Sequence, residues 1–200
     1  MSIQTVGIIG AGTMGNGIAQ ACAVSGVNVV MVDISEAAVA KGIATVTSSL
    51  DRLIKKEKMT EAEKTAALAR IHGSTQYQDL QKAQLVIEAA TENFDLKVKI
   101  LKQVDSLLAE DVVVASNTSS ISITKLAAAT TRADRFIGMH FFNPVPMMAL
   151  VEIIRGLQTS DATHDAVQAL AKRLGKSPIT VKNAPGFVVN RILVPMINEA

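Results

Sequence analysis

A glycine-rich turn between an apolar run and an amphipathic segment constrains this chain more than any other feature. The turn reads Gly10-Ala11-Gly12-Thr13-Met14-Gly15. It follows the apolar run Thr5–Ile9 and opens the segment Thr13–Ser25, whose apolar residues recur at helical spacing. The first glycine permits a tight bend, the second lets a pyrophosphate approach the backbone, and the third lets the helix pack on the strand. The pattern predicts a strand, turn and helix that bind a dinucleotide, with a merely flexible glycine loop as the alternative.

A second apolar run indicates which dinucleotide is bound. Asn28–Val32 is rich in valine and ends on Asp33, eighteen positions after Gly15. A carboxylate at the end of the second strand accepts a hydrogen bond from an adenosine ribose hydroxyl and repels a 2′-phosphate. We therefore expect NAD rather than NADP as the cofactor, with a plain helix-capping role for Asp33 as the alternative.

Further short apolar runs predict the rest of a sheet. Helical patterns separate most of these runs. Alternation of strands and helices builds a mainly parallel sheet with helices on both faces, so the expected fold class is α/β and Rossmann-like. The predicted strands are Ile71–Ser74, Leu85–Glu88, Val112–Ser116, Phe136–His140, Leu150–Ile154 and Ile179–Val181.

Two consecutive helices are predicted where a single crossover would suffice. They span Ser35–Lys58 and Thr60–Arg70, and Glu63 stands three residues after Thr60, which is the spacing of a capping box. This inserted helix pair is an addition to the plain strand–helix alternation. The other predicted helices are Asp161–Leu174, which ends before Gly175, and a helix that begins at Val188 and reaches Ala200 without a C-cap signal.

Composition excludes several classes of protein. With 48% hydrophobic residues, 200 residues can bury one substantial core. A net charge of +2 and 3% aromatic residues disfavour nucleic-acid binding. The one cysteine, Cys22, cannot form an intramolecular disulfide or a thiolate metal cluster, which fits a protein of a reducing compartment. We expect Cys22 to be a buried core residue of a helix. No membrane span or targeting signal is visible, so we expect a cytoplasmic protein.

A histidine and a glutamate on two successive apolar strands are candidates for proton transfer. His140 ends the first of them, and Glu152 lies inside the second, Leu150–Ile154. A carboxylate in an apolar strand is costly unless it is paired. If the strands are neighbours, Glu152 holds the Nδ1 proton of His140 and leaves Nε2 free to take a proton from an alcohol. A purely structural histidine is the alternative.

Two polar segments allow a functional and a structural interpretation. Asn117-Thr118-Ser119-Ser120 follows the strand Val112–Ser116, where its side chains could line a site or cap the next helix. Lys55-Lys56-Glu57-Lys58 ends the first inserted helix. It could be a solvated face or an anion site for a phosphorylated substrate.

Taken together, five signatures in this order resemble the L-3-hydroxyacyl-CoA dehydrogenases, and within them the stand-alone bacterial enzymes that act on 3-hydroxybutyryl-CoA. The resemblance covers essentially the whole chain. The signatures are Gly10 to Gly15, Glu88-Ala89-Ala90-Thr91-Glu92, Ser116-Asn117-Thr118-Ser119, Gly138-Met139-His140-Phe141-Phe142-Asn143-Pro144 and Pro185-Gly186-Phe187-Val188-Val189-Asn190-Arg191.

The resemblance implies a reaction and roles for particular residues. The family oxidises the 3-hydroxyl group of a coenzyme A thioester, passing hydride to NAD+ while a histidine takes the proton. It implies His140 as that base and Glu152 as its partner. It also implies that Ser119 and Asn190 bind the substrate oxygens. The further cofactor contacts that it implies are Asn143 beside the nicotinamide, and Glu92 and Lys97 around the nicotinamide-side ribose, with Ser119 near both ligands.

The inserted helix pair, at about residues 35–70, resembles the coenzyme A site of the family. This favours Lys56 as the cation for the coenzyme A phosphate, with Ser49 and Arg52 as further candidates on the same helix. The expected substrate is therefore an acyl-CoA thioester, and no metal is expected.

The resemblance also predicts the domain organisation. Residues 1–184 are expected to form the NAD-binding domain, and 185–200 to begin a helical C-terminal domain that the family has and this chain lacks. That domain forms the homodimer interface and one wall of the substrate cleft. We therefore expect this chain to bind NAD but to turn over substrate weakly.

Two other functions remain open from the sequence. A dehydrogenase of free 3-hydroxy acids would use a lysine as its base and need no coenzyme A site. A non-catalytic dinucleotide-binding protein would need neither His140 nor Glu152. Short-chain dehydrogenases are excluded because the one tyrosine, Tyr77, has Gln81 rather than lysine four positions on.

Overall fold

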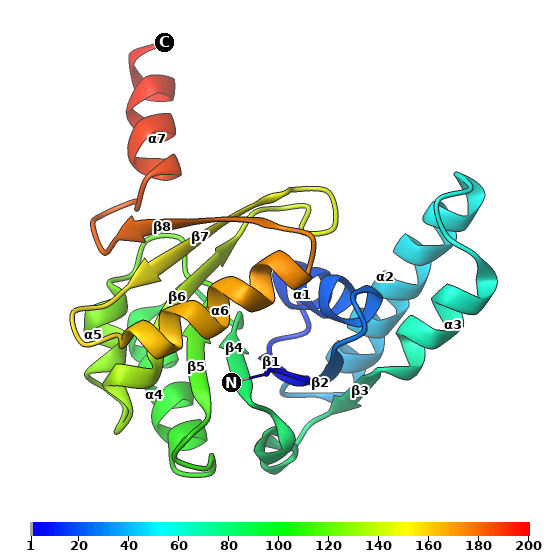
Figure 1. Cartoon of the computed structure of the whole chain (residues 1–200), viewed down its shortest axis with the longest axis horizontal. Coiled ribbons are helices and arrows are strands. Elements are labelled where there is room, and N and C mark those ends of the chain that lie inside the picture. Colours follow the sequence, from blue (N-terminus) through cyan, green and yellow to red (C-terminus); the bar gives the residue numbers. More distant parts are fainter. Residues whose placement is uncertain (1) are drawn as a thin grey trace.

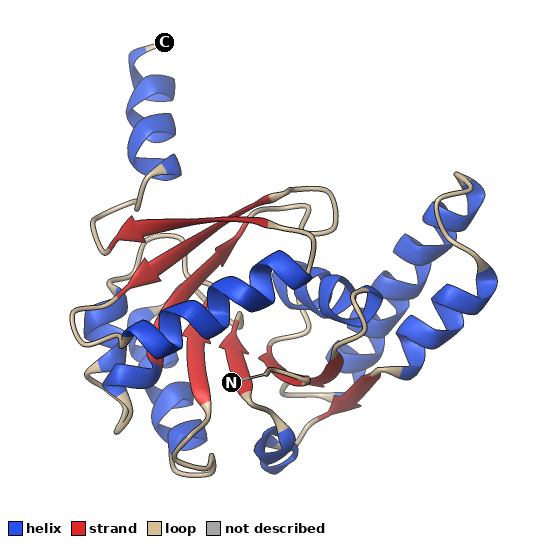
Figure 2. Cartoon of the chain, viewed as in Figure 1, coloured by secondary structure: helices blue, strands red, loops and turns tan. Residues whose placement is uncertain are grey.

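An eight-stranded sheet forms the centre of the molecule. The structure is a computed structural model that describes residues 2–200. The strands lie in the order β3-β2-β1-β4-β5-β6-β7-β8 (Figures 1 and 2). The strands β1 to β6 are parallel, β7 is antiparallel to β6, and β8 is parallel to β7, so the predicted mainly parallel sheet is confirmed. The strands are β1 Thr5–Ile9, β2 Asn28–Val32, β3 Ile71–Ser74, β4 Leu85–Glu88, β5 Val113–Ser116, β6 Phe136–Phe141, β7 Leu150–Arg155 and β8 Ser177–Lys182.

The strand bounds follow the apolar runs closely. The first four strands begin and end as predicted, and β5, β6 and β7 differ from the prediction by one residue. The largest difference is β8, which spans Ser177–Lys182 rather than Ile179–Val181. It is an edge strand in which only Val181 is buried, so its sequence carries no continuous apolar run, and an edge strand tolerates Pro178.

Helices cover both faces of the sheet, as predicted. Two buried clusters lie on opposite faces because successive side chains of a strand point to opposite sides, as Ile8 and Ile9 do. The helices α1 and α6 pack on the first cluster, and α4 and α5 pack on the second (Figure 1). The helices are α1 Thr13–Val24, α2 Glu36–Lys55, α3 Glu61–Ala69, α4 Phe94–Asp105, α5 Ile123–Ala127, α6 Asp161–Arg173 and α7 Val189–Glu199.

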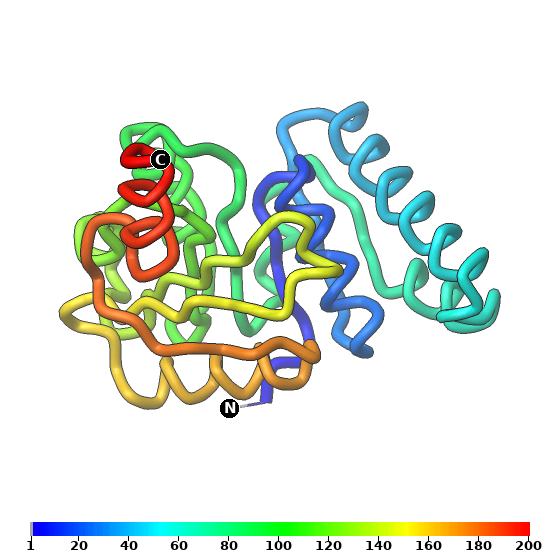
Figure 3. Tube along the Cα trace, turned by 90° about the horizontal axis from the view of Figure 1, so that it is seen from above, coloured from blue at the N-terminus to red at the C-terminus, as the bar shows by residue number. Residues whose placement is uncertain are grey.

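The two inserted helices are confirmed as α2 and α3. Thr60 caps α3, and its capping box with Glu63 is present: the Thr60 N–H donates to the Glu63 carboxylate at 2.7 Å, and the Glu63 N–H donates to the Thr60 hydroxyl at 3.2 Å. A small separate core of Ala23, Val46, Leu50 and Ala67 joins the pair to α1. Figure 3 places this pair at the opposite end of the molecule from α7.

The sole cysteine lies in the core of α1, as predicted. Cys22 is fully buried. Burial raises the pKa of its thiol to about 12, although the positive charge of Arg173 opposes part of this rise. The thiol is therefore protonated and unreactive at neutral pH.

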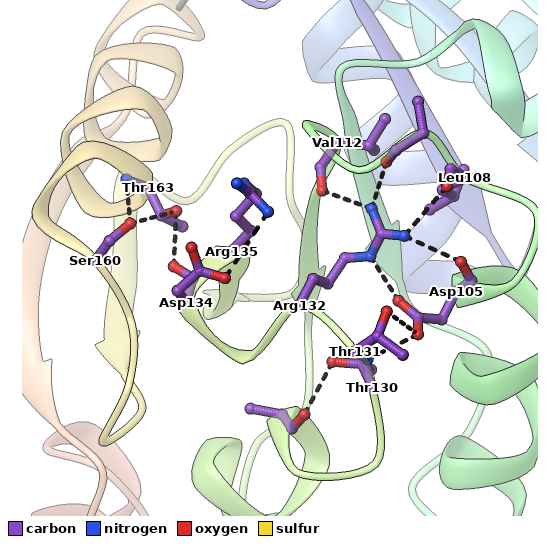
Figure 4. Close-up of polar contacts among 12 residues, drawn as sticks. Asp105, Leu108, Val112, Thr130, Thr131, Arg132, Asp134, Arg135, Ser160 and Thr163 are labelled. Atoms are coloured by element: carbon purple, nitrogen blue, oxygen red, sulfur yellow. Dashed lines mark hydrogen bonds and ion pairs between the residues drawn. The ribbon is translucent and has the colours of Figure 1, made fainter.

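A buried arginine fastens the end of α4 to the segment before β6 (Figure 4). The guanidinium of Arg132 donates to the Asp105 carboxylate at 2.5 Å and to its carbonyl at 3.0 Å. It also donates to the carbonyls of Leu108, Ala109 and Val112. Because the last carbonyls of a helix lack intrahelical partners, this side chain satisfies the carbonyl of Asp105, the last residue of α4, and it also binds the loop that follows.

The last helix, α7, extends away from the sheet (Figure 1). It lies close to the predicted Val188–Ala200. Most of its apolar side chains are exposed: Ile192, Met196 and Ile197 are each 62% exposed. Among the described helices, none has the length and apolar character needed to cross a bilayer.

Candidate active site

The glycine turn has the geometry that a dinucleotide phosphate requires. Gly10 has a φ of +103°, and a Cβ there would lie 2.7 Å from the Ala89 carbonyl oxygen. A Cβ on Gly15 would lie 1.8 Å from the Gly10 carbonyl oxygen, so the helix can approach the strand only without one. Among residues 2–200, a Cβ on Gly12 would meet no atom within 4 Å, and no side chain caps the α1 N-terminus. Open space and free helix amides fit a pyrophosphate.

Asp33 lies where the adenosine ribose is expected. Its Oδ2 accepts a hydrogen bond from the Ala11 N–H at 2.6 Å, and its Oδ1 accepts one from the Ile34 N–H at 2.7 Å. The carboxylate thus joins the end of β2 to the glycine turn and keeps lone pairs for a ribose hydroxyl. It does not cap α2, because that helix begins with Ser35 as its cap. Together with the glycine turn, Asp33 fits NAD.

The antiparallel pairing of β6 and β7 brings His140 and Glu152 together. The two residues are direct partners in the strand register, and His140 Nδ1 lies 2.8 Å from Glu152 Oε2. His140 is 6% exposed and Glu152 is fully buried. An ionised carboxylate keeps the proton on Nδ1 and leaves the Nε2 lone pair available. The predicted pair therefore has the geometry of an oriented proton acceptor.

Two aromatic rings and one helix start surround this pair. The ring centroids of Phe142 and Phe187 lie 4.4 Å and 5.8 Å from that of His140. The second carboxylate oxygen of Glu152, Oε1, accepts hydrogen bonds from the N–H groups of Val188 and Val189, each at 2.9 Å. Every oxygen of the buried carboxylate is thus hydrogen-bonded, which offsets the cost of burying its charge.

The loop after β5 meets residues from two other elements. The Ser119 N–H donates to Glu92 Oε1, and the Thr118 hydroxyl donates to Glu92 Oε2, both at 2.7 Å. The Asn190 side chain on α7 donates to the Ser119 carbonyl at 3.4 Å. The structure therefore brings Ser119, Asn190 and Glu92 together. Asn143 is exposed, two residues beyond the end of β6.

Asn117 stabilises the sheet edge rather than capping a helix. Its side-chain oxygen accepts a hydrogen bond from the Phe141 N–H at 2.8 Å, and so ties the end of β5 to the end of β6. The next helix, α5, is capped by Ser122. The capping alternative for Asn117-Thr118-Ser119-Ser120 is therefore wrong, because the helix begins later than the polar segment.

A buried ion pair under the sheet edge has no counterpart in the expectations from sequence. Lys97 Nζ pairs with Glu88 Oε2, which also accepts a hydrogen bond from the Ser116 hydroxyl at 2.8 Å. Lys97 is 1% exposed, so its ammonium group lies beneath the surface of the protein. The sequence did contain one indication of this pair. Glu88 ends an apolar strand, where a carboxylate costs free energy unless it is paired, and the same argument identified Glu152.

The coenzyme A candidates lie on the second half of α2 and at its end. Arg52 and Lys56 are exposed, Ser49 is partly buried, and Lys56 is the C-cap residue of α2. Arg52 donates to the Ser48 hydroxyl at 3.2 Å. No hydrogen bond or ion pair joins these three residues to His140 or Glu152 in the part of the chain that the structure describes.

Comparison with known proteins agrees with this geometry. Residues 5–184 match the family described as "3-hydroxyacyl-CoA dehydrogenase, NAD binding domain". The 3-hydroxybutyryl-CoA dehydrogenase of Bradyrhizobium diazoefficiens is 50% identical over 99% of this chain and 68% of its own length. That of Clostridioides difficile is 47% identical over 96% of this chain and 69% of its own.

Solved structures give the same result. The crystal structure of (S)-3-hydroxybutyryl-CoA dehydrogenase PaaH1 from Ralstonia eutropha is 79% identical in sequence, and it superposes with a TM-score of 0.98. The match covers 99% of this chain and 70% of that one. Similarity of this extent includes the glycine turn, both paired strands and the inserted helices.

Proposed function

The chain belongs to the 3-hydroxyacyl-CoA dehydrogenases through their NAD-binding domain family, and from this premise we propose that it interconverts (S)-3-hydroxybutyryl-CoA and acetoacetyl-CoA with NAD. One observation carries the proposal: the 2.8 Å contact between His140 and Glu152. That pair lies at the carboxyl end of β6, the edge of the parallel strands where the glycine turn also lies. Ligands of such sheets bind at this edge.

The proposed base is His140. With Glu152 ionised and its proton kept on Nδ1, the imidazole can take the proton of the substrate 3-hydroxyl group at Nε2. Glu152 stabilises the imidazolium ion that forms, and the same proton returns to the keto oxygen when the reaction runs in reverse. NAD+, when bound, accepts the hydride that leaves C3 of the substrate. No metal ion is part of the proposal.

The neighbours of the pair are proposed to orient both ligands. The Ser119 hydroxyl and the Asn190 amide would bind the substrate oxygens, and the hydrogen bond from the Asn190 amide to the Ser119 carbonyl supports a common pocket. Asn143 and Glu92 would contact the nicotinamide side of the cofactor. The burial of Lys97 supports an indirect contribution through Glu88 rather than a direct contact.

The adenosine half would rest on the glycine turn. We propose that the backbone of Gly10 to Gly15 and the α1 N-terminus bind the pyrophosphate, and that Asp33 binds the ribose and disfavours a 2′-phosphate. Lys56 would pair with a phosphate of coenzyme A, with Ser49 and Arg52 nearby on α2. The exposure of Lys56 and Arg52 supports this role.

The exposure of α7 and of its apolar side chains bears on the domain organisation and the assembly. We propose that 1–184 is the NAD-binding domain and that 185–200 begins a second, helical one, which the exposure of α7 from Arg191 onward supports. The unpartnered apolar face of α7 supports a homodimer. The single buried thiol supports a cytoplasmic location.

A spectrophotometric assay tests the proposed reaction. NADH oxidation is followed with acetoacetyl-CoA and, in parallel, with free acetoacetate. Loss of NADH absorbance with the thioester alone is expected. Loss with the free acid would indicate a dehydrogenase of free 3-hydroxy acids. NAD binding without any NADH loss would indicate either a dinucleotide-binding protein without this activity or a chain whose turnover is too weak to detect.

A further inference from the structure

The first turn of α7 lies directly against the His140–Glu152 pair. Phe187 is 2% exposed, and its ring packs near that of His140. The next two residues, Val188 and Val189, donate their N–H groups to Glu152. From Arg191 onward every residue of the helix is exposed. The contacts that anchor α7 to the domain are therefore the contacts that surround the pair.

The backbone of this turn is arranged to hold an anion. Phe187 adopts a left-handed conformation, with φ of +51°, and Val188 follows in the right-handed region, with φ of −108° and ψ of −53°. This order of conformations turns successive N–H groups toward one point and forms a concave anion site. The anion here is the Glu152 carboxylate, whose Oε1 lies 2.9 Å from both nitrogen atoms.

A left-handed conformation is strained for phenylalanine and would be free of strain for glycine. Such strain persists only where the surroundings fix the residue. At Phe187 the side chain supplies that constraint, because it is buried against His140 while its backbone begins the anion site. The ring and the turn thus act on the two members of the pair at once.

We propose that Phe187 is a positioning residue for the His140–Glu152 pair, and that the seating of the Gly186–Val189 turn sets the orientation of the imidazole. Two amides fix one carboxylate oxygen, so the other oxygen is aimed at Nδ1, and the phenyl ring limits tilting of the imidazole. Asn190 follows in the same turn and donates to the Ser119 carbonyl, so the seating of α7 also sets the position of Asn190 relative to the loop after β5. The catalytic meaning of this positioning rests on the proposed function, but the contacts can be tested without substrate.

NMR spectroscopy tests the proposal on Phe187→Leu, with Phe136→Leu as the matched control. Phe136 is equally buried, on the same strand as His140 but at its start. In Phe187→Leu we expect the His140 Nδ1–H resonance to be lost to solvent exchange. Amide exchange at Val188 and Val189 should rise about tenfold, the effect of losing roughly one hydrogen bond. Phe136→Leu should keep the resonance and change exchange at both amides less than twofold.

A second variant separates the effect of the phenyl ring from the effect of the backbone conformation. Phe187→Gly removes the ring but suits the left-handed conformation, so slow exchange at Val188 and Val189 should persist while the Nδ1–H resonance is lost. A Phe187→Leu protein that is folded, as judged by thermal denaturation, and that keeps the resonance and both slow amides would overturn the proposal. These readouts need no turnover, so absence of dehydrogenase activity would count against the proposed function alone.

Discussion

Lys97 and Glu88 form an ion pair beneath the carboxyl ends of β4 and β5, where their side chains are 1% and 0% exposed. The pair also supports the glycine turn. Glu88 Oε1 accepts a hydrogen bond from the Ala90 N–H at 2.9 Å, and the Ala89–Ala90 backbone is what a Cβ on Gly10 would meet. The buried charges therefore hold the backbone against which the dinucleotide turn rests.

Removing one member of this pair should be costly. Lys97→Met leaves the Glu88 carboxylate buried without its counter-ion, and we expect the free energy of unfolding to fall by about 3–5 kcal/mol. The double variant Glu88→Gln/Lys97→Met removes both charges and should recover most of that loss. Urea denaturation measures both. If the free energy of unfolding of Lys97→Met lay within about 1 kcal/mol of the wild-type value, the pair would not stabilise this edge.

The Glu152 carboxylate should matter for turnover and not for cofactor affinity. Glu152→Gln replaces the anion by an amide that cannot stabilise an imidazolium, so we expect kcat to fall by about 10²–10⁴ while the Kd for NAD stays within about twofold. His164→Gln is the control, because the His164 ring contacts Asp165 on α6 and Thr180 on β8 rather than Glu152. Steady-state kinetics and calorimetry give the two values; an unaltered kcat would refute the catalytic pairing.

The sheet and the His140–Glu152 pair could be predicted because burying a polar or charged group without a partner costs free energy. Apolar runs define buried strands, and a carboxylate within such a run needs a partner from the neighbouring strand. The same cost applies to Glu88, but its partner Lys97 lies on a helix, and no spacing rule links a strand end to a helix face. The left-handed Phe187 had no sequence signal, since glycine is the residue that marks this conformation.

Cofactor choice should depend on the charge of Asp33. Asp33→Asn keeps an oxygen that can accept from the Ala11 N–H but loses the charge that repels a 2′-phosphate. We expect the Kd for NADP to fall about tenfold relative to that for NAD, equivalent to roughly 1.4 kcal/mol. Calorimetric titration with each dinucleotide measures the ratio, and an unchanged ratio would assign specificity to other residues.

Acid should destabilise the domain through Asp105 (Figure 4). Burial alone would raise the pKa of its carboxyl group, but hydrogen bonds from Arg132 and Thr131 outweigh burial and hold the pKa below the ordinary value. The unfolded chain therefore binds this proton at higher pH than the native state does. The stabilisation is complete above the unfolded pKa of about 4 and is lost as the pH falls through the lower folded pKa.

Arg132→Met should therefore lower the free energy of unfolding at pH 7 and flatten its dependence on pH below about 4. Urea titrations between pH 7 and pH 3 measure this slope. Arg135→Met is the control, because Arg135 forms only an exposed 3.9 Å pair with Asp134, and its loss should cost less than about 1 kcal/mol. An equal acid slope in wild type and Arg132→Met would contradict the assignment to Asp105.

Replacing Gly15 or Gly12 of the turn by alanine should have different effects on stability and NAD binding. A Cβ at Gly15 would lie 1.8 Å from a backbone oxygen, so Gly15→Ala must displace the helix and lose both stability and NAD binding. A Cβ at Gly12 meets nothing within 4 Å, so Gly12→Ala should fold with a Tm close to that of the wild type.

The Gly12 methyl group would nevertheless occupy the space through which a pyrophosphate reaches the backbone amides. We therefore expect Gly12→Ala to weaken NAD binding at least about tenfold without loss of stability. Thermal denaturation and calorimetric titration, run on both variants, separate the two effects. If Gly12→Ala bound NAD as tightly as the wild type, the pyrophosphate would not lie against this turn, because only a bound ligand can come into conflict with that methyl group.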